Sequence, residues 1–298
     1  MKQFVWMLCG IFLSGLLLGT LSACGTNQVS TCIITTTNPF AARAAPGPEE
    51  AETPAEALSE DTARRLAYGK ALWDLYQLCL LPSGEELERA TDLGPAGGNQ
   101  FAIADVNGDG EEELIVLWTR ACMAGMQGLV YGYDSGELRL ELSEFPDLTF
   151  YASGAVQAGW SHNQGWAGRF WPYALYQYSP ERGVYEQIGD VDAWDLSCTE
   201  GDEVLTAAFP READADGDGL VYYLLSGEWY NNPHFSEDGS FSQIWGADPV
   251  DGAALEDWLN RYTGGAEPLD IPFQDLTEET IAVLGCPKPE VEYPEPLG

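Results

Sequence analysis

One stretch decides the fold of this 298-residue chain: Phe101-Ala-Ile-Ala-Asp-Val-Asn-Gly-Asp-Gly-Glu-Glu-Glu-Leu-Ile-Val116. Apolar residues stand on both sides of an acidic centre, which predicts a strand, a loop and a second strand. Within the loop, Asp105, Asn107 and Asp109 alternate with other residues, and Gly110 follows. Oxygen side chains at positions 1, 3 and 5 of a loop, with glycine at position 6 for the sharp turn, are typical of a calcium-binding loop.

Calcium takes roughly six to eight oxygen ligands. Position 7 of the loop would give a backbone carbonyl, and position 9 would give a carboxylate. The predicted ligands are therefore Asp105, Asn107, Asp109, Glu111 and Glu113. Position 12 is Val116, so the bidentate glutamate of a full EF-hand is missing. The alternative is an ordinary hairpin turn, for which one Asn-Gly or Asp-Gly pair suffices.

The stretch resembles the loops of FG-GAP/VCBS-type repeats, in which an Asp-x-Asn-Gly-Asp-Gly-x-x-acid loop lies between strands. It is also similar to a group of bacterial lipoproteins of unassigned function that carry one such EF-hand-like loop. The resemblance covers about sixteen residues and implies the same five ligands. A full β-propeller is not expected, because the chain shows no periodic copies of a blade.

A second acidic loop precedes the apolar run Leu220–Leu225. Asp214, Asp216 and Asp218 occupy positions 1, 3 and 5, but position 9 is Tyr222, so the closing carboxylate is absent. This loop is either a weak second metal site or an aspartate-rich turn.

The N-terminus resembles a bacterial lipoprotein signal. Lys2 is followed by an apolar run and then by Leu21-Ser22-Ala23-Cys24, which is similar to a lipobox. The resemblance implies cleavage before Cys24 and acylation of its thiol, for example with diacylglycerol and palmitate. Residues 1–23 would then be a signal peptide and 24–58 a flexible tether, and the protein would be extracytoplasmic and lipid-anchored to the cell membrane. An uncleaved membrane helix and a plain secretory signal are the alternatives.

The chain is strongly acidic, with 13 basic and 48 acidic residues and a formal charge of −35. Such a chain does not bind nucleic acid or an anionic lipid surface through charge, so acyl chains must anchor it. Five cysteines remain after the lipobox, too few for three disulfides, and their pairing is open: Cys32, Cys79, Cys122, Cys198 and Cys286. None are spaced as Cys-x-x-Cys, which argues against a redox motif or a zinc site.

The predicted fold is an α+β domain over residues 59–286, followed by an extended tail at 287–298. Ser59 is expected to cap a helix that runs to about Leu80. A mostly antiparallel β-meander follows, with the calcium-loop hairpin first and short C-terminal helices last. The expected strands after the loop are 113–119, 128–133, 137–142, 149–152, 173–178 and 184–188.

Aromatic residues gather in one glycine-rich segment, and Trp160, Trp166 and Trp171 are its tryptophans. On the surface they could stack on a glycan or grip a protein partner; the alternative is that they fill the core. Sequence motifs for hydrolases or phosphate binding are missing, and His162 and His234 stand in loop-like settings. The sequence therefore favours a non-enzymatic binding or surface module. The alternatives are a secreted hydrolase acting on cell-surface glycan and a calcium-responsive interaction protein.

Overall fold

The computed structural model describes residues 58–87, 98–162, 166–225, 234–235, 241–242 and 247–290. The described residues do not include the predicted signal segment, Cys24, Cys32, nearly all of the predicted tether or the end of the predicted tail. Residues 56–298 form one compact unit. Within the described ranges, no helix has the length and apolar character needed to cross a membrane.

The N-terminal helix α1 spans Glu60–Leu78 and begins where the sequence predicts. The Ser59 hydroxyl accepts a hydrogen bond from the Thr62 backbone N–H, so Ser59 is the N-cap. The helix ends slightly earlier than predicted because Cys79 adopts a left-handed conformation (φ 57°) and donates its N–H to Leu75. Cys79 is buried, as expected.

The first sheet is fully antiparallel and has the order β13-β1-β2-β3-β4. The acidic loop from Asp105 to Glu112 joins its first two long strands, as predicted, and Ala104 pairs with Glu113 at the base of the loop. Both faces of this sheet are covered by other parts of the fold. Successive residues of the run 114–117 are therefore apolar, because each side of the strand faces the protein interior. The strands are β1 (Gln100–Ala104), β2 (Glu113–Trp118), β3 (Gln127–Asp134), β4 (Glu137–Glu144) and β13 (Gln274–Asp275).

The remaining long strands form a second antiparallel sheet with the order β12-β9-β8-β7-β6-β5. The single meander predicted from sequence is therefore divided into two sheets, and the chain passes from one to the other after β4. A separate two-stranded sheet pairs β10 (His234–Phe235) with β11 (Phe241–Ser242). The second sheet contains β5 (Leu148–Phe150), β6 (Ala155–Gly159), β7 (Tyr173–Ser179), β8 (Val184–Asp195), β9 (Leu220–Leu225) and β12 (Pro249–Val250).

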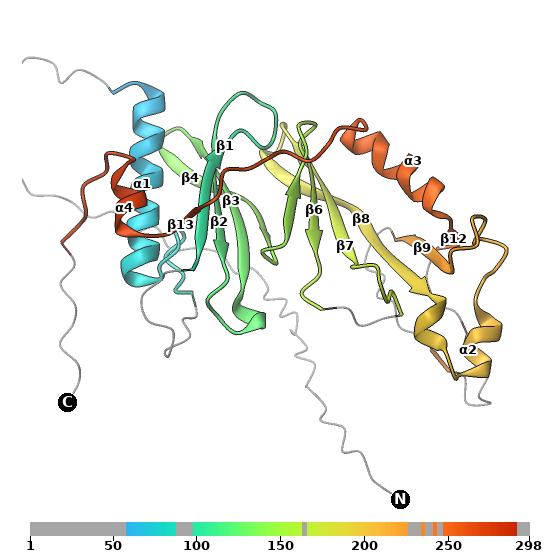
Figure 1. The fold of residues 1–298 in the computed structure, drawn as a ribbon. Helices are drawn as coiled ribbons and strands as arrows, with labels where there is room; N and C mark the ends of the chain where they lie inside the picture. The colour runs from blue at the N-terminus through green and yellow to red at the C-terminus, as the bar shows by residue number, and fades with distance from the viewer. Residues whose placement is uncertain are drawn as a thin grey trace, which may run out of the picture. The chain divides into compact units, whose positions relative to one another are not determined.

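Helices cover the outer faces of the two sheets. The C-terminal helix α4 (Glu278–Ala282) lies beside α1 at one end of the first sheet (Figure 1). The helix α3 (Gly252–Thr263) packs on the second sheet through Trp258 and Leu259. The shorter elements are η1 (Met123–Gly125), η2 (Leu196–Thr199) and α2 (Glu203–Ala208).

The two sheets meet in one hydrophobic cluster. Successive residues of β2 and β3 lie on opposite faces of the first sheet. Ile115 and Val130 point toward the second sheet, whereas Leu114 and Leu129 pack with α1. The segment after α3 also enters the cluster, and the Leu269 N–H donates to the Phe150 carbonyl at 2.8 Å. This segment returns the chain from the second sheet to β13 in the first (Figure 1).

Candidate cation-binding loops

The loop between β1 and β2 is closed by hydrogen bonds from its own backbone. The Asp105 carboxylate accepts the N–H groups of Gly108 (2.8 Å) and Gly110 (3.0 Å). The Asn107 side-chain oxygen accepts a hydrogen bond from the Asp109 N–H at 2.9 Å. The Asp109 carboxylate accepts one from the Glu111 N–H. Positions 1, 3 and 5 therefore all turn their oxygens toward the interior of the loop.

Glu113 supports this loop from beneath. Its Oε2 accepts the Val106 N–H at 2.9 Å, and its Oε1 accepts a hydrogen bond from Asn107 Nδ2 at 3.1 Å. The residue is only 2% exposed. The pKa of Glu113 is raised to about 8, mainly by burial. The nearby carboxylates of Glu141, Asp109 and Asp105 contribute to this rise, and the hydrogen bond from Val106 opposes it.

A second buried carboxylate, Glu141, stands beside Glu113 and was missed in the sequence. Its Oε1 accepts a hydrogen bond from Arg139 at 2.8 Å, while its buried Oε2 has no hydrogen-bond partner. Burial raises the pKa of Glu141, and Arg139 and Asn107 lower it. Glu141 is the extra residue of a β-bulge in β4. Because the bulge breaks the alternation of the strand, a residue that the sequence pattern places outside turns inward.

The loop lies where α1 and both sheets come together. Tyr185 of the second sheet donates its hydroxyl to the Val106 carbonyl at 3.3 Å. Tyr68 of α1 donates its hydroxyl to the Glu112 carbonyl at 2.7 Å, and Arg65 forms an ion pair with the Glu112 carboxylate at 3.0 Å. The loop therefore connects α1, the first sheet and the second sheet, and ordering of the loop would stabilise the contacts among them.

The second acidic loop, between α2 and β9, repeats three of the four backbone-to-side-chain hydrogen bonds of the first. The Asp214 carboxylate accepts the N–H of Gly219 at 3.2 Å, five residues on, as Asp105 does in the first loop. Asp216 accepts from Asp218 (3.0 Å), and Asp218 accepts from Leu220 (2.8 Å). Glycines with positive φ stand at positions 4 and 6 of both loops. The two loops are thus alike in backbone as well as in sequence.

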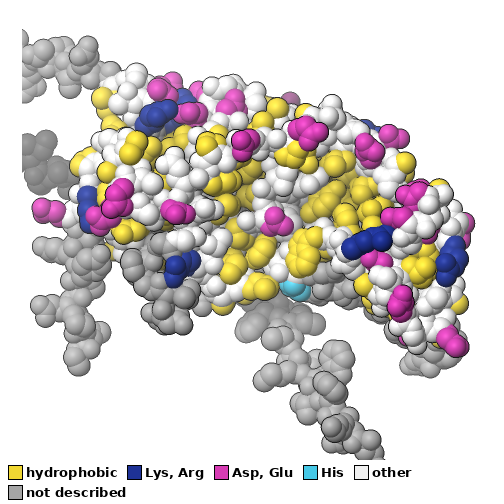
Figure 2. Space-filling view, in the orientation of Figure 1, with side chains coloured by type: hydrophobic (Ala, Val, Ile, Leu, Met, Phe, Trp, Pro, Cys, Tyr) yellow, Lys and Arg dark blue, Asp and Glu magenta, His cyan; other side chains and the backbone are white. Residues whose placement is uncertain are grey.

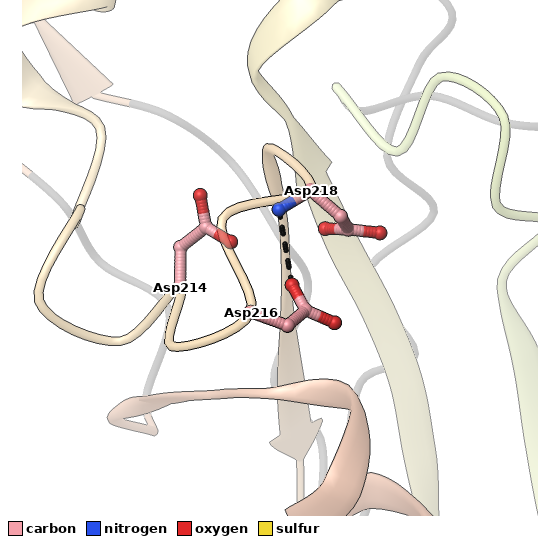
Figure 3. Close-up of side chains that lie close together, drawn as sticks. All are labelled: Asp214, Asp216 and Asp218. Carbon is pink, nitrogen blue, oxygen red and sulfur yellow. Dashed lines mark hydrogen bonds between the residues drawn. The ribbon is translucent and has the colours of Figure 1, made fainter.

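The three aspartates of the second loop converge. One oxygen of each lies within 4.8 Å of the others (Figure 3). Of the described residues, this is the one group in which three acidic side chains come so close; Asp105, Asp109 and Glu113 do not. Asp214 Oδ1 is buried and has no hydrogen-bond partner. The second loop therefore has the more convergent carboxylates, although its sequence matches the calcium-loop pattern less well because position 9 is Tyr222.

An arginine lies against this second loop. Arg169 Nη2 donates to the Asp218 carbonyl at 2.7 Å and to the Asp218 carboxylate at 2.9 Å. Arg169 also faces buried Asp195, whose Oδ2 accepts the Arg169 backbone N–H at 3.1 Å. Burial raises the pKa of Asp195, but hydrogen bonds from Ser197 and Arg169 outweigh it and the net shift is downward. Arg169 thus neutralises part of the charge that a metal ion would neutralise.

These groups line an open pocket of about 570 Å³. Its polar side chains come from Arg169, Asp195, Ser197, Glu200, Thr206 and Asp218. A carboxyl with a lowered pKa is ionised at neutral pH, so Asp195 is not suited to act as a general acid. The pocket offers one guanidinium and three carboxylates, and Arg169 forms ion pairs with two of the carboxylates, those of Asp195 and Asp218.

The three tryptophans of the aromatic segment have different surroundings. Trp166 stacks on fully buried Trp194, with ring centroids 5.0 Å apart. Trp160 is half-buried, and its carbonyl accepts a hydrogen bond from Trp171 Nε1 at 2.7 Å. Trp171 itself is 49% exposed. Of the three, Trp171 is the side chain most available to a ligand, whereas Trp166 is partly buried and packs against a hydrophobic cluster of the core.

The remaining residues considered in the sequence are Cys24 and the two histidines. Cys24 and the side chain of His234 lie outside what the structure describes, and His162 Nδ1 lies 2.7 Å from the Ser161 hydroxyl. The visible face carries scattered Asp and Glu side chains and few basic ones (Figure 2). Comparisons with protein families, with curated proteins and with solved structures give no match to this chain.

Proposed function

We propose that this chain is an extracytoplasmic bacterial lipoprotein, anchored through Cys24, whose folded domain binds calcium in the loop from Asp105 to Glu113. The ion has a structural role, and the domain acts as a binding or surface module. The anchor rests on the lipobox-like sequence Leu21-Ser-Ala-Cys24. The calcium site rests on the hydrogen-bonded loop at the junction of α1 and the two sheets.

The charge around the loop supports a cation. Asp105 and Asp109 lie in the loop, and Glu113 and Glu141 are buried beneath it, but Arg139 is the one basic side chain bonded to these four carboxylates in the described structure. Buried carboxylates that repel one another destabilise a fold unless a cation offsets them. Calcium outside the cell is abundant, so even a dissociation constant of roughly 0.1–1 mM gives an occupied site.

Isothermal titration with calcium tests the site. We expect binding to the wild-type chain and its loss in Asp109→Ala, which removes the position-5 ligand. Glu137→Ala is the matched control, because Glu137 is an exposed acid outside the loop and its removal changes the net charge equally. Equal calcium binding by wild type and Asp109→Ala contradicts a site in this loop.

The second loop is a weaker candidate site. Arg169 occupies the Asp218 carboxylate, so a metal ion must displace a guanidinium before it can bind there. Titration of Asp109→Ala isolates this loop: residual calcium binding that Asp216→Ala abolishes would assign it to Asp214, Asp216 and Asp218.

The binding role rests on Trp171. A half-exposed indole beside a loop is a common anchor for a glycan or a protein. A hydrolase is less well supported, because the described pocket near Asp195 holds a carboxyl of lowered pKa rather than a poised acid. Screening of glycans and surface proteins for binding that Trp171→Ala removes, and that Leu140→Ala at another exposed apolar site does not, tests the binding role.

A further inference from the structure

We propose that the open pocket beside Arg169 and the aromatic rings next to it form one binding site for a neutral glycan. The inference rests on the proposed binding role of the domain and names the ligand class. It joins the half-exposed indole of Trp171 to side chains from β8, β9 and the segment before β7.

The site lies on one face of the second sheet. In β8, Val191, Ala193 and Asp195 are two residues apart and therefore share a face. Cross-strand partners lie on the same face as each other. Tyr173 pairs with Val191, and Tyr222 pairs with Ala193. Two aromatic side chains and one carboxylate thus follow one another along this face.

A third ring joins the two tyrosines. The centroid of the Phe170 ring lies 5.9 Å from that of Tyr173 and 5.2 Å from that of Tyr222. Phe170 and Tyr222 pack against the small cluster that contains buried Ala193. All three rings are only partly buried, so each keeps some surface open to a ligand.

Trp171 continues the aromatic surface. The Trp160 N–H donates to the Pro172 carbonyl at 2.9 Å, which extends the pairing of β6 with β7 beyond Tyr173. Residues two apart in an extended chain point to the same face, so Trp171 shares the face of Tyr173. Its indole N–H donates to the Trp160 carbonyl and holds the ring in place. Four aromatic side chains therefore offer faces on which the C–H groups of sugar rings can stack.

The pocket of about 570 Å³ forms the polar end of the site. Arg169 connects it to the rings, because Arg169 directly precedes Phe170 and bonds to Asp218 in the pocket wall. Asp195, which follows Ala193 on the shared face, is 2% exposed and also lines the pocket. Aromatic surface beside a few fixed polar groups, around a space of roughly 300–1,000 Å³, is the usual form of a small-ligand site.

The polar groups of the pocket select the ligand class. The Arg169 guanidinium only donates hydrogen bonds, and the carboxylates of Asp195, Glu200 and Asp218 only accept them. A sugar hydroxyl both donates and accepts, so it pairs with either kind of group without carrying a charge. Three carboxylates face one guanidinium, and the chain has a formal charge of −35, so an anionic glycan is repelled. Charge complementarity therefore favours a neutral glycan.

The test is isothermal titration of the full-length chain in a detergent without sugar groups. The probes are four neutral hexasaccharides, cellohexaose, maltohexaose, mannohexaose and chitohexaose, and one anionic hexasaccharide of hyaluronan. We expect the chain to bind at least one neutral probe and to bind hyaluronan more weakly. Arg169→Ala and Trp171→Ala should each weaken binding of the neutral probe about tenfold. Glu200→Ala, at an exposed residue of the pocket, should weaken it without affecting folding.

Arg182→Ala is the matched control. Arg182 is exposed and pairs with Glu186 in the turn region between β7 and β8, outside the site, so its removal should leave glycan affinity unchanged. Equal effects of Arg169→Ala and Arg182→Ala overturn the inference, because the glycan then binds elsewhere. Tighter binding of hyaluronan than of every neutral probe also overturns it.

Failure of the inference and failure of the proposed binding role give different results. If none of the four neutral probes binds, the inference is overturned; binding of a surface protein that Trp171→Ala removes would then leave the binding role standing. If neither a glycan nor a surface protein binds in a manner that depends on Trp171, the binding role falls and the glycan site falls with it.

Discussion

The Tyr185 hydroxyl donates a hydrogen bond to the carbonyl of Val106 at 3.3 Å and so joins β8 of the second sheet to the acidic loop of the first. Both residues are buried. The loop is therefore attached to the second sheet from inside the molecule, as well as to α1 through Tyr68. Ordering of the loop should stabilise the packing between the sheets.

Tyr185→Phe tests this connection. Removal of the hydroxyl leaves the buried Val106 carbonyl without this donor, and the free energy of unfolding should fall by about 1–2 kcal/mol. Urea denaturation measures the change. Tyr178→Phe is the matched control, since Tyr178 packs edge-on against Tyr185 and has no hydroxyl hydrogen bond within the described residues. Equal losses in the two variants would contradict a specific role for the Val106 contact.

Asp190 makes stability depend on pH. Burial, Glu144 and Asp192 raise the pKa of this carboxyl from 3.8 to about 6, although Trp160 and Gln187 bond to it and lower it. The folded state thus holds the Asp190 proton more tightly than the unfolded state does. This contribution to stability is complete below about pH 4 and is lost as the pH rises through about 6.

Asp190→Asn removes the ionisation. Relative to wild type, the variant should gain on the order of 1–2 kcal/mol of stability between pH 4 and pH 7, a range reduced for solvent screening. Urea denaturation across this pH range measures the difference. Asp270→Asn, at an exposed aspartate, is the control. A constant difference between Asp190→Asn and wild type at all pH values would show that Asp190 does not titrate in this way.

Substitution of Trp166 and substitution of Trp171 should lower the free energy of unfolding by different amounts. Trp166→Ala removes a ring that stacks on Trp194 and should cost about 2–4 kcal/mol. Trp171→Ala removes a half-exposed ring and one hydrogen bond to the Trp160 carbonyl, and should cost about 1 kcal/mol or less. A larger loss for Trp171→Ala than for Trp166→Ala would place Trp171 in the core.

The lipid anchor is tested by mass spectrometry of the chain purified from bacterial membranes. The wild-type chain should begin at Cys24 and carry the mass of its acyl groups. Cys24→Ser should lack this modification, whereas Cys9→Ser, a matched change within the signal segment, should be processed normally. A wild-type mass that still includes residues 1–23 would favour the uncleaved membrane helix.

Local signals in the sequence predicted much of the fold. Ser59 caps α1 because a short hydroxyl side chain precedes a helical apolar pattern. The hairpin at Asp134-Ser135-Gly136 joins β3 and β4 as expected, with Ser135 and Gly136 at positive φ. Such features depend on neighbouring residues, which a single sequence contains.

Features that depend on distant parts of the chain were missed. The strand β6 contains mainly small residues, and its pairing partners in β5 and β7 define it. The division into two sheets is not visible in the local periodicity of either. Glu141 lies inside because of a bulge, and Arg169 meets Asp218 from 49 residues away. Only tertiary packing brings such residues together.

Thermal unfolding with and without calcium tests the central claim most directly. With millimolar calcium and a dissociation constant of roughly 0.1–1 mM, binding adds about 1 kcal/mol, which should raise the melting temperature of the wild-type chain by about 2–4 °C above its value in EDTA. Asp109→Ala should abolish this rise, and Glu137→Ala should keep it. Identical melting temperatures of the wild-type chain in calcium and in EDTA would contradict a structural calcium site in the loop from Asp105 to Glu113.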